Sequence, residues 1–195
     1  PLMIEQRVHF ADDRSHKYKM LDYLLADVAM RQSIVFIATK RDAEALAVKL
    51  QGEGHAAAAL HGDMNQRERT HTLQTMRRGG VRTLVATDVA ARGLDVAGIT
   101  HVINFDLPRQ EEDYVHRIGR TGRAGRSGSA LLFVTPRERH LLKAIERHTR
   151  STLVEAELPT IDDVNEQLRS RTIARSQANV NYLKAQIAAT DVVAL

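Results

Sequence analysis

The stretch Ser33-Ile34-Val35-Phe36-Ile37-Ala38 decides the fold. Its successive apolar side chains cannot alternate between a buried and a solvated face, so we predict a strand that is buried on both faces of a parallel sheet. Further strands are predicted at residues 4–10, 56–60, 82–86, 101–105 and 130–135. Amphipathic stripes lie between them, with Leu21, Leu24, Leu25 and Val28 in one and Ala43, Leu46, Ala47 and Leu50 in another. This alternation predicts an α/β fold, a parallel sheet with helices on both faces.

The pattern changes after about residue 150. Leu158-Pro159 interrupts the chain, and a polar helical segment follows in which apolar residues are sparse. We therefore expect one domain over residues 3–150 and a mostly helical C-terminal extension over residues 151–195. A lone helix of this kind does not stabilise itself. Three roles stay open for the extension: a solvated helix surface, an RNA-targeting segment and a homodimer interface.

Composition narrows the class of protein only moderately. The net charge of +4 favours nucleic acid weakly, and the 22 Arg against 6 Lys fit phosphate recognition or a codon preference equally well. There is no cysteine, no apolar run long enough to cross a membrane and no leader that resembles a signal peptide. The nine histidines show no metal-ligand spacing. We expect a soluble, cytoplasmic protein with no metal site of its own and no membrane partner.

Polar residues follow the predicted strands at the points where those strands end. These are Thr39-Lys40, His61-Gly62-Asp63, Thr87-Asp88 and Asp106. In an open parallel sheet, ligands bind beyond the carboxyl ends of the strands. We therefore expect these loops to converge on a site at one edge of the sheet.

The densest cationic segment is HRIGRTGRAGR at residues 116–126, where arginine recurs at every third position and glycine precedes three of the four. Glycine lets backbone N–H groups approach an anion closely, and each guanidinium group offers two parallel donors to phosphate oxygens. A flexible basic tail is the alternative interpretation. The apolar residues on both sides of the segment place it inside a packed domain and favour a phosphate site.

The segment at 116–123 resembles the last helicase motif of the DEAD-box family. ATDVAARGLD at 86–95 resembles the preceding motif, LHGDMNQRER at 60–69 carries the Gln-x-x-Arg element, and IVFIATK at 34–40 resembles the motif that opens the domain. Order and spacing agree over residues 4–150. His116 stands where DEAH-box and RecQ-like relatives have Gln. The chain thus resembles the C-terminal RecA-like domain of a superfamily 2 DEAD-box ATP-dependent RNA helicase.

The resemblance implies a nucleotide-binding set of residues. Arg120 and Arg123 match the catalytic arginines that reach the γ-phosphate of ATP, while Asp95, with Gly93 beside it, matches the ribose contact. We expect both guanidinium groups to face the carboxyl edge of the sheet, free of internal contacts that would hold them away from a nucleotide.

The resemblance also implies an RNA-binding set and a coupling set. The positions that match RNA sugar-phosphate contacts are Thr39, Gly62, Arg69 and Thr87. The positions that match links between the nucleotide and RNA sites are His116 and Arg117, and we expect internal or interdomain ion pairs at Asp88 and Arg92.

The chain lacks a Gly-Lys dipeptide and the Asp-Glu-Ala-Asp sequence. The resemblance therefore implies that ATP and Mg²⁺ are held mainly by an N-terminal RecA-like domain of the same polypeptide, and that the isolated chain does not hydrolyse ATP. RNA is the implied partner, and local duplex unwinding the implied activity. Two other functions stay open: a non-catalytic RNA-binding or dimerising module, and a DNA helicase of the same superfamily.

Overall fold

The computed structural model describes residues 3–156 and 161–193. The chain divides into two compact units, residues 1–157 and 158–195, which are considered separately. The predicted Leu158-Pro159 interruption lies outside the described residues.

The first unit is built on a seven-stranded sheet in which every pair of neighbouring strands is parallel, in the order β3-β4-β2-β5-β6-β1-β7. The strands are β1 (Ile4–Phe10), β2 (Ser33–Phe36), β3 (Ala57–Leu60), β4 (Thr83–Ala86), β5 (His101–Asn104), β6 (Gly128–Val134) and β7 (Val154–Glu155). The helices are α1 (Arg14–Leu25), α2 (Lys40–Gly52), α3 (Gln66–Arg77), α4 (Asp88–Ala91), α5 (Glu111–Ile118), the 3₁₀ turn η1 (Pro136–Glu138) and α6 (Arg139–Thr149). The predicted α/β fold is confirmed.

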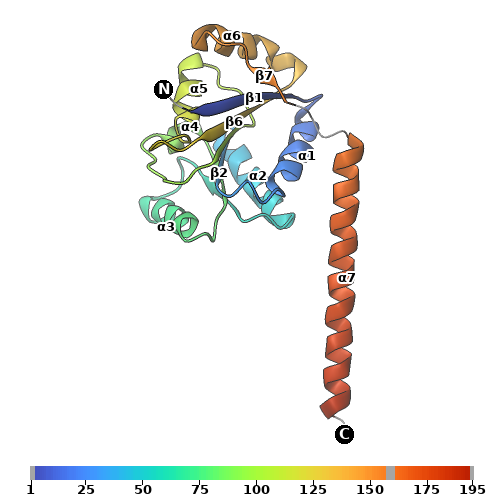
Figure 1. The fold of residues 1–195 in the computed structure, drawn as a ribbon. Coiled ribbons are helices and arrows are strands. Elements are labelled where there is room, and N and C mark those ends of the chain that lie inside the picture. The colour runs from blue at the N-terminus through green and yellow to red at the C-terminus, as the bar shows by residue number, and fades with distance from the viewer. Residues whose placement is uncertain (1–2, 157–160, 194–195) are drawn as a thin grey trace. The chain divides into compact units, whose positions relative to one another are not determined.

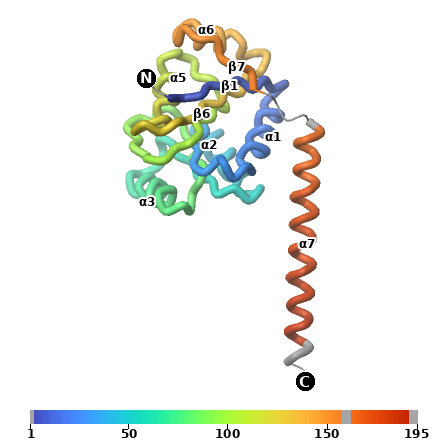
Figure 2. The backbone as a smooth tube through the Cα atoms, in the orientation of Figure 1, coloured from blue at the N-terminus to red at the C-terminus, as the bar shows by residue number. Residues whose placement is uncertain are grey.

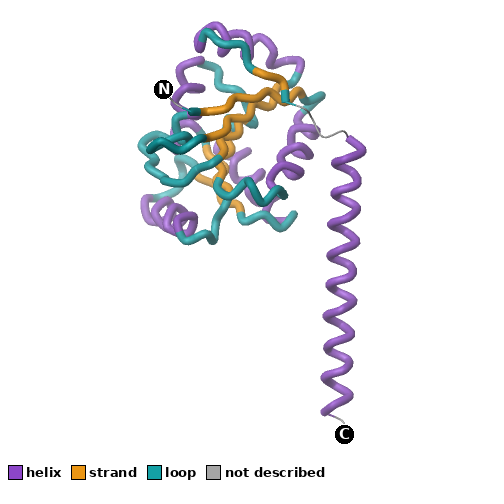
Figure 3. Tube along the Cα trace, in the orientation of Figure 1, coloured by secondary structure: helices purple, strands orange, loops and turns teal. Residues whose placement is uncertain are grey.

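Helices cover both faces of the sheet, as Figures 1 and 3 show. On one face, α3, α4, α5 and α6 contribute Met76, Ala90, Tyr114 and Ile145 to cores that also contain strand side chains. The connections through α1 and α2 run in the opposite direction along the sheet, and right-handed crossovers then place those helices on the other face. All residues of β2 are buried, in agreement with the apolar run that predicted it.

Side-chain caps fix where the helices next to the strand ends begin. Asn65 accepts a hydrogen bond from the Glu68 N–H (2.8 Å), and the Glu68 carboxylate accepts one from the Asn65 N–H (2.9 Å). The hydroxyl of Thr39 accepts from the N–H of Asp42 (3.1 Å) at the start of α2. These contacts satisfy N–H groups that have no partner within the helix. The loops before α2 and α3 are therefore fixed in place.

Strand β1 comes first in the sheet unit, but it lies between β6 and β7, which come last. Figure 2 shows the blue β1 beside β6 and β7. Strand β7 was not predicted. It pairs Val154 with Arg7 and Glu155 with Val8. Residues 154–155 therefore belong to the sheet unit and not to the extension, so the unit runs beyond the expected boundary at residue 150.

The second unit contains one described helix, α7 (Ile161–Val193). The expected C-terminal helical extension is confirmed. Its exposed apolar side chains include Ile173, Val180, Leu183 and Ile187. Among the described residues, no helix combines the length and the apolar character that a membrane span needs.

Candidate functional site

The polar loops after β3, β4, β2 and β5 lie side by side, because these four strands are neighbours in the sheet. Thr39 and Gly62 are exposed there, directly beyond β2 and β3. A Cβ atom added at Gly62 would meet no atom within 4 Å, so the backbone of this residue is open to an approaching ligand. The predicted convergence of these loops on the carboxyl edge is confirmed.

Arg69 and Thr87 are less accessible than the other two residues of the RNA-binding set. Arg69 donates from Nη2 to the carbonyl oxygen of Ala90 (2.9 Å), which ties α3 to α4. Thr87 is buried at the start of α4, and its side chain makes no capping hydrogen bond. The structure therefore brings the set to one edge, with two members at the surface and two behind them.

Three further contacts hold the loop that carries Gly62. The Nε2 atom of His61 lies 2.8 Å from the Glu44 carboxylate, and its Nδ1 atom accepts from the N–H of Asp63 (3.3 Å). This second contact assigns the ring proton to Nε2 when the imidazole is neutral. Lys40 reaches Asp63 from α2 over 3.0 Å. Sequence reasoning named this loop but not the role of Glu44, since only the fold brings α2 beside it.

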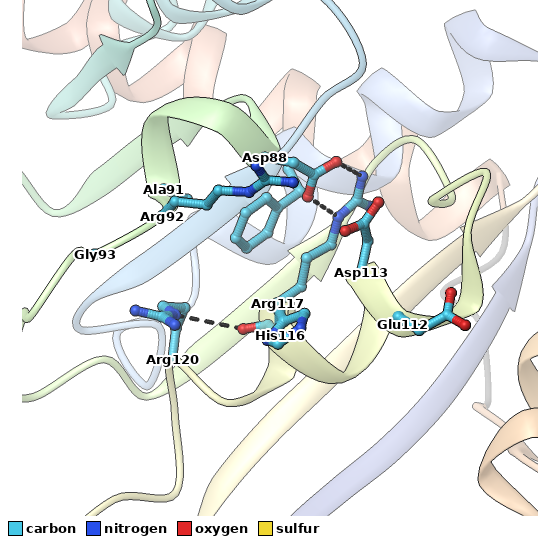
Figure 4. A pocket seen from close by; sticks show the side chains of 10 residues that line it. Asp88, Ala91, Arg92, Gly93, Glu112, Asp113, His116, Arg117 and Arg120 are labelled. Carbon is cyan, nitrogen blue, oxygen red and sulfur yellow. Dashed lines mark hydrogen bonds and ion pairs between the residues drawn. The ribbon is translucent and has the colours of Figure 1, made fainter.

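Arg117 is a buried cation that joins α5 to the carboxyl edge. Its Nε and Nη2 atoms donate to the two carboxylate oxygens of Asp88 (2.6 and 2.8 Å), as Figure 4 shows. Nη1 donates to the Asp106 carbonyl (2.6 Å) and the Asn104 amide oxygen (3.2 Å). The guanidinium also lies 5.1 Å from the centre of the Phe36 ring. The expectation of an internal ion pair is confirmed for Asp88; Asn104 was not predicted.

A cavity of 340 Å³ lies beside Arg117, between α4 and α5. Charged side chains of both signs line it, and His116 and Arg92 are exposed at its surface. Its lining consists of Phe36, Asp88, Ala91, Arg92, Gly93, Glu112, Asp113, His116, Arg117 and Arg120. It thus connects the carboxyl edge with the two loops that carry the predicted nucleotide set.

The expectation that Arg120 and Arg123 face the carboxyl edge is wrong for the loop that carries them. That loop follows a helix, and α5 leads the chain back toward the amino ends of the strands. Thr121 packs there against Gly128, the first residue of β6. Of the two arginines, Arg120 lines the cavity that begins at the carboxyl edge, and Arg123 does not. The predicted RNA-binding and nucleotide sets therefore occupy different places on the sheet unit.

Both arginines make hydrogen bonds within the sheet unit. Arg120 donates from Nη1 to the Leu94 carbonyl (2.5 Å) and from Nε to the His116 carbonyl (3.3 Å). Arg123 donates from Nε to the Gly119 carbonyl (2.8 Å) and from Nη1 to the Asp95 carboxylate (3.3 Å). The contacts to Leu94 and Asp95 join the loop at 119–126 to the loop at 93–99.

The electrostatics of this junction are cationic. Burial lowers the pKa of Arg120, the neighbouring charge of Arg123 lowers it further, and the carboxylate of Asp95 opposes both. The Asp95 side chain is 93% exposed and that of Arg123 43% exposed. Two guanidinium groups therefore share one solvated carboxylate, an arrangement that favours an additional anion.

The backbone of the loop at 93–99 turns at Gly93, whose φ of +73° is a left-handed conformation suited to glycine. Asp95 lies two residues after this turn, and its side chain is exposed to solvent. Across residues 3–156 and 161–193, no three acidic or histidine side chains gather where they could hold a metal ion. The chemistry that this junction offers is therefore anion binding by guanidinium groups and hydrogen-bond acceptance by one carboxylate.

The comparisons with known proteins agree with these motifs. The model of the helicase conserved C-terminal domain matches residues 16–125. The chain is 61% identical over 134 residues to the ATP-dependent RNA helicase DeaD of Mycobacterium tuberculosis H37Rv, covering 69% of this chain and 24% of that protein. It is 43% identical over 182 residues to the DEAD-box ATP-dependent RNA helicase CshA of Bacillus subtilis 168, covering 91% and 37%. The chain thus spans well under half the length of these relatives.

Solved structures show the same fold. Escherichia coli DEAD-box protein SrmB, bound to regulator of ribonuclease activity A, is similar at a TM-score of 0.77 and 39% identity, over 83% of this chain and 93% of that chain. Saccharomyces cerevisiae Dbp5 bound to RNA and ADP BeF3 also has a TM-score of 0.77, at 32% identity, over 87% and 46%. The sheet unit is therefore RecA-like, and this chain belongs to the helicase conserved C-terminal domain family, within the DEAD-box RNA helicases.

Proposed function

We propose that this chain is the C-terminal half of an RNA-dependent ATPase that opens short RNA duplexes, and that Arg120 and Arg123 act on the γ-phosphate of ATP. One observation carries the proposal: both guanidinium groups and the solvated carboxylate of Asp95 lie on two joined loops beside a cavity lined by His116. Phosphoryl transfer requires positive charge on the transferring group, and an arginine finger contributes about 10³- to 10⁵-fold in rate.

The present contacts of the arginines are compatible with that role because they are exchangeable. The Arg123–Asp95 pair is exposed, and exposed ion pairs contribute about 0–1 kcal/mol. The other acceptors are backbone carbonyls, of which those of His116 and Gly119 are exposed and that of Leu94 is part-buried, and a doubly charged phosphate is a stronger acceptor than a neutral carbonyl. Little free energy therefore holds the two side chains away from a nucleotide.

The residues present fit part of a nucleotide. Arg120 and Arg123 would contact phosphate oxygens, and Asp95, beside the Gly93 turn, would accept hydrogen bonds from ribose hydroxyls. Among the described residues, no group of three or more acidic or histidine side chains could hold a metal ion. We propose that ATP and Mg²⁺ are held mainly by an N-terminal RecA-like domain, in a two-domain polypeptide called the parent enzyme below. When bound there, the metal would neutralise charge on the phosphates.

RNA would bind along the carboxyl edge through Thr39, Gly62, Arg69 and Thr87. The similarity to Dbp5, which has been solved with RNA and ADP BeF3, supports this assignment. Contacts to the sugar-phosphate backbone carry no sequence information, so binding would tolerate many sequences. Local unwinding would follow when the closed parent enzyme bends one strand of the duplex.

His116 and Arg117 would couple the two sites. Arg117 fixes α5 to Asp88 and to the carbonyl of Asp106 at the carboxyl edge, and α5 leads directly into the loop with Arg120. His116 lines the cavity between the two regions and is exposed. A movement at the RNA edge would therefore reach the arginine loop through a helix with a fixed end.

The decisive experiment compares Arg123→Ala with Arg126→Ala in the parent enzyme. Both arginines are exposed on the same loop, but only Arg123 lies beside Asp95. We expect Arg123→Ala to lower RNA-stimulated kcat for ATP hydrolysis by about a thousandfold or more, with Arg126→Ala close to wild type. Retention of more than about a tenth of wild-type turnover in Arg123→Ala contradicts the catalytic role. Parallel assays with DNA separate an RNA helicase from a DNA helicase.

A second function, self-association through α7, is favoured by the spacing of its exposed side chains. Ile173, Val180 and Ile187 recur at intervals of seven, with Leu183 between the last two, which is the spacing of a coiled-coil seam. Light scattering should give a mass of about twice 21.8 kDa for the chain and a monomer mass for Val180→Lys. A monomer mass for the wild-type chain at every concentration contradicts this function.

A further inference from the structure

Thr121 supplies a third link between the loop at 119–126 and the loop at 93–99, in addition to the two arginine contacts. Its hydroxyl donates to the carbonyl oxygen of Ile99 over 2.6 Å. The residue is 1% exposed, whereas Arg123 is exposed. The link made by Thr121 is therefore shielded from water, and the link made by Arg123 is not.

Gly128 provides the space that the Thr121 side chain fills. A Cβ atom at Gly128 would meet the Thr121 hydroxyl, would lie 2.6 Å from its methyl group and would lie 2.7 Å from the backbone nitrogen of Gly122. Real Cβ atoms do not approach other atoms this closely. The absence of a side chain at the first position of β6 thus seats Thr121 directly on the sheet.

The three links differ in what happens when a phosphate arrives. Arg120 must release the Leu94 carbonyl, and Arg123 must release Asp95, if both guanidinium groups turn to a nucleotide. Thr121 carries no charge and is enclosed, so its hydrogen bond to Ile99 stays. Of the three side-chain links between the described loops, it alone keeps the arginines in register with Asp95 in the nucleotide-bound state.

We infer that Thr121 is a positioning residue for ATP hydrolysis, an inference that rests on the proposed function. It acts through Arg120 and Arg123, which flank it in the sequence, and it does not touch the reacting atoms. Its contribution grows as the arginine links are given up, so loss of the hydroxyl impairs the catalytic step more than it impairs RNA binding. The proposed RNA-binding residues lie on other segments, with Arg69 in α3, and do not depend on this link.

The test uses Thr121→Val and Thr121→Ser in the parent enzyme. Valine keeps the shape of threonine and removes the hydroxyl, whereas serine keeps the hydroxyl. We expect Thr121→Val to lower kcat by about tenfold or more, because small misplacements of catalytic groups are costly, while RNA affinity stays within about twofold. Thr121→Ser should stay within about threefold of wild-type kcat.

Amide hydrogen exchange in the nucleotide-free parent enzyme gives a second measurement. Thr121→Val should speed exchange in residues 93–99 and 119–126 relative to wild type, and Thr121→Ser should not. This comparison does not require ATPase activity. If the wild-type parent enzyme lacks RNA-stimulated hydrolysis, the proposed function fails, while the exchange data still test the link.

Several outcomes overturn the inference. One is a Thr121→Val enzyme with kcat within about twofold of wild type. Another is equal loss of kcat in the valine and serine variants, which assigns the effect to packing and not to the hydroxyl. A parallel loss of RNA affinity, or failure of the valine variant to fold, likewise shows a general structural role.

Discussion

Arg117 and Arg123 belong to the same cationic segment, yet their surroundings are opposite. Arg117 is buried and makes four hydrogen bonds, to Asp88, Asn104 and Asp106. Arg123 is exposed and shares a solvated carboxylate. The difference teaches that a guanidinium group held by several buried acceptors stabilises the fold, whereas one held by exposed acceptors remains available to a ligand. Partners, and not residue type, separate the two roles.

The largest effect on stability should come from Arg117→Ala. The substitution leaves the Asp88 carboxylate and the Asp106 carbonyl without their donors, and breaking a buried ion pair costs about 3–5 kcal/mol. Because the Asp88 side chain is 31% exposed, we expect the lower end of this range. Urea denaturation of the chain measures the change, with Arg126→Ala as the exposed control. A loss below about 1 kcal/mol would remove the contrast between buried and exposed arginines.

His9 extends the comparison of Arg117 with Arg123 to a third case. It is a buried basic group, like Arg117, but its Nδ1 atom has no hydrogen-bond partner. Burial, and secondarily the charge of Arg7, lower the pKa of His9 to about 4. The unfolded chain binds the proton at about pH 6.5. His9 should therefore lower the free energy of unfolding by about 2–3 kcal/mol as the pH falls from about 6.5 to about 4, because the unfolded chain then binds a proton that the folded chain does not.

The measurement compares urea denaturation of wild type and His9→Phe from pH 7 to pH 4. The difference between the two curves should change through this window, with wild type losing more stability toward acid. A constant difference would show that His9 does not remain neutral in the folded protein.

The smallest effect should come from Asp95→Asn in the isolated chain. The Asp95 carboxylate is almost fully solvated and contacts Arg123 over 3.3 Å, so the free energy of unfolding should change by less than about 0.5 kcal/mol. Thermal and urea denaturation both report this quantity. A loss of more than about 1 kcal/mol in the free energy of unfolding would show that Arg123, like Arg117, stabilises the fold. The contrast between the two arginines would then be wrong.

Much of the fold follows from local patterns in the sequence. The apolar run at residues 34–37 suits a doubly buried strand, and the pairing of Asn65 with Glu68 marks the start of α3. Val28 was assigned to the stripe of α1, but the helix ends at Leu25 and Val28 is exposed. Strand β7 has two exposed residues and forms only through its pairing with β1, so no local pattern announces it.

The site was predictable where it follows strands and not where it follows a helix. Parallel strands bring Thr39 and Gly62 to one edge whatever the loops between them do. The position of Arg123 depends instead on the length of α5 and on how Thr121 seats against Gly128. These features depend on packing between a loop residue and a strand residue. The spacing of residues along the sequence does not predict such packing.

The position of β1 between β6 and β7 has a consequence for biosynthesis. Residues 4–10 leave the ribosome before the rest of the sheet unit, but their pairing partners at residues 128–134 and 154–155 are translated last within it. Closure of the sheet thus waits for nearly the whole unit to be translated, and such long-range pairing slows folding and prolongs exposure of apolar strand surface. A recombinant fragment that starts after residue 11 or stops before residue 156 would leave an open sheet edge and invite aggregation.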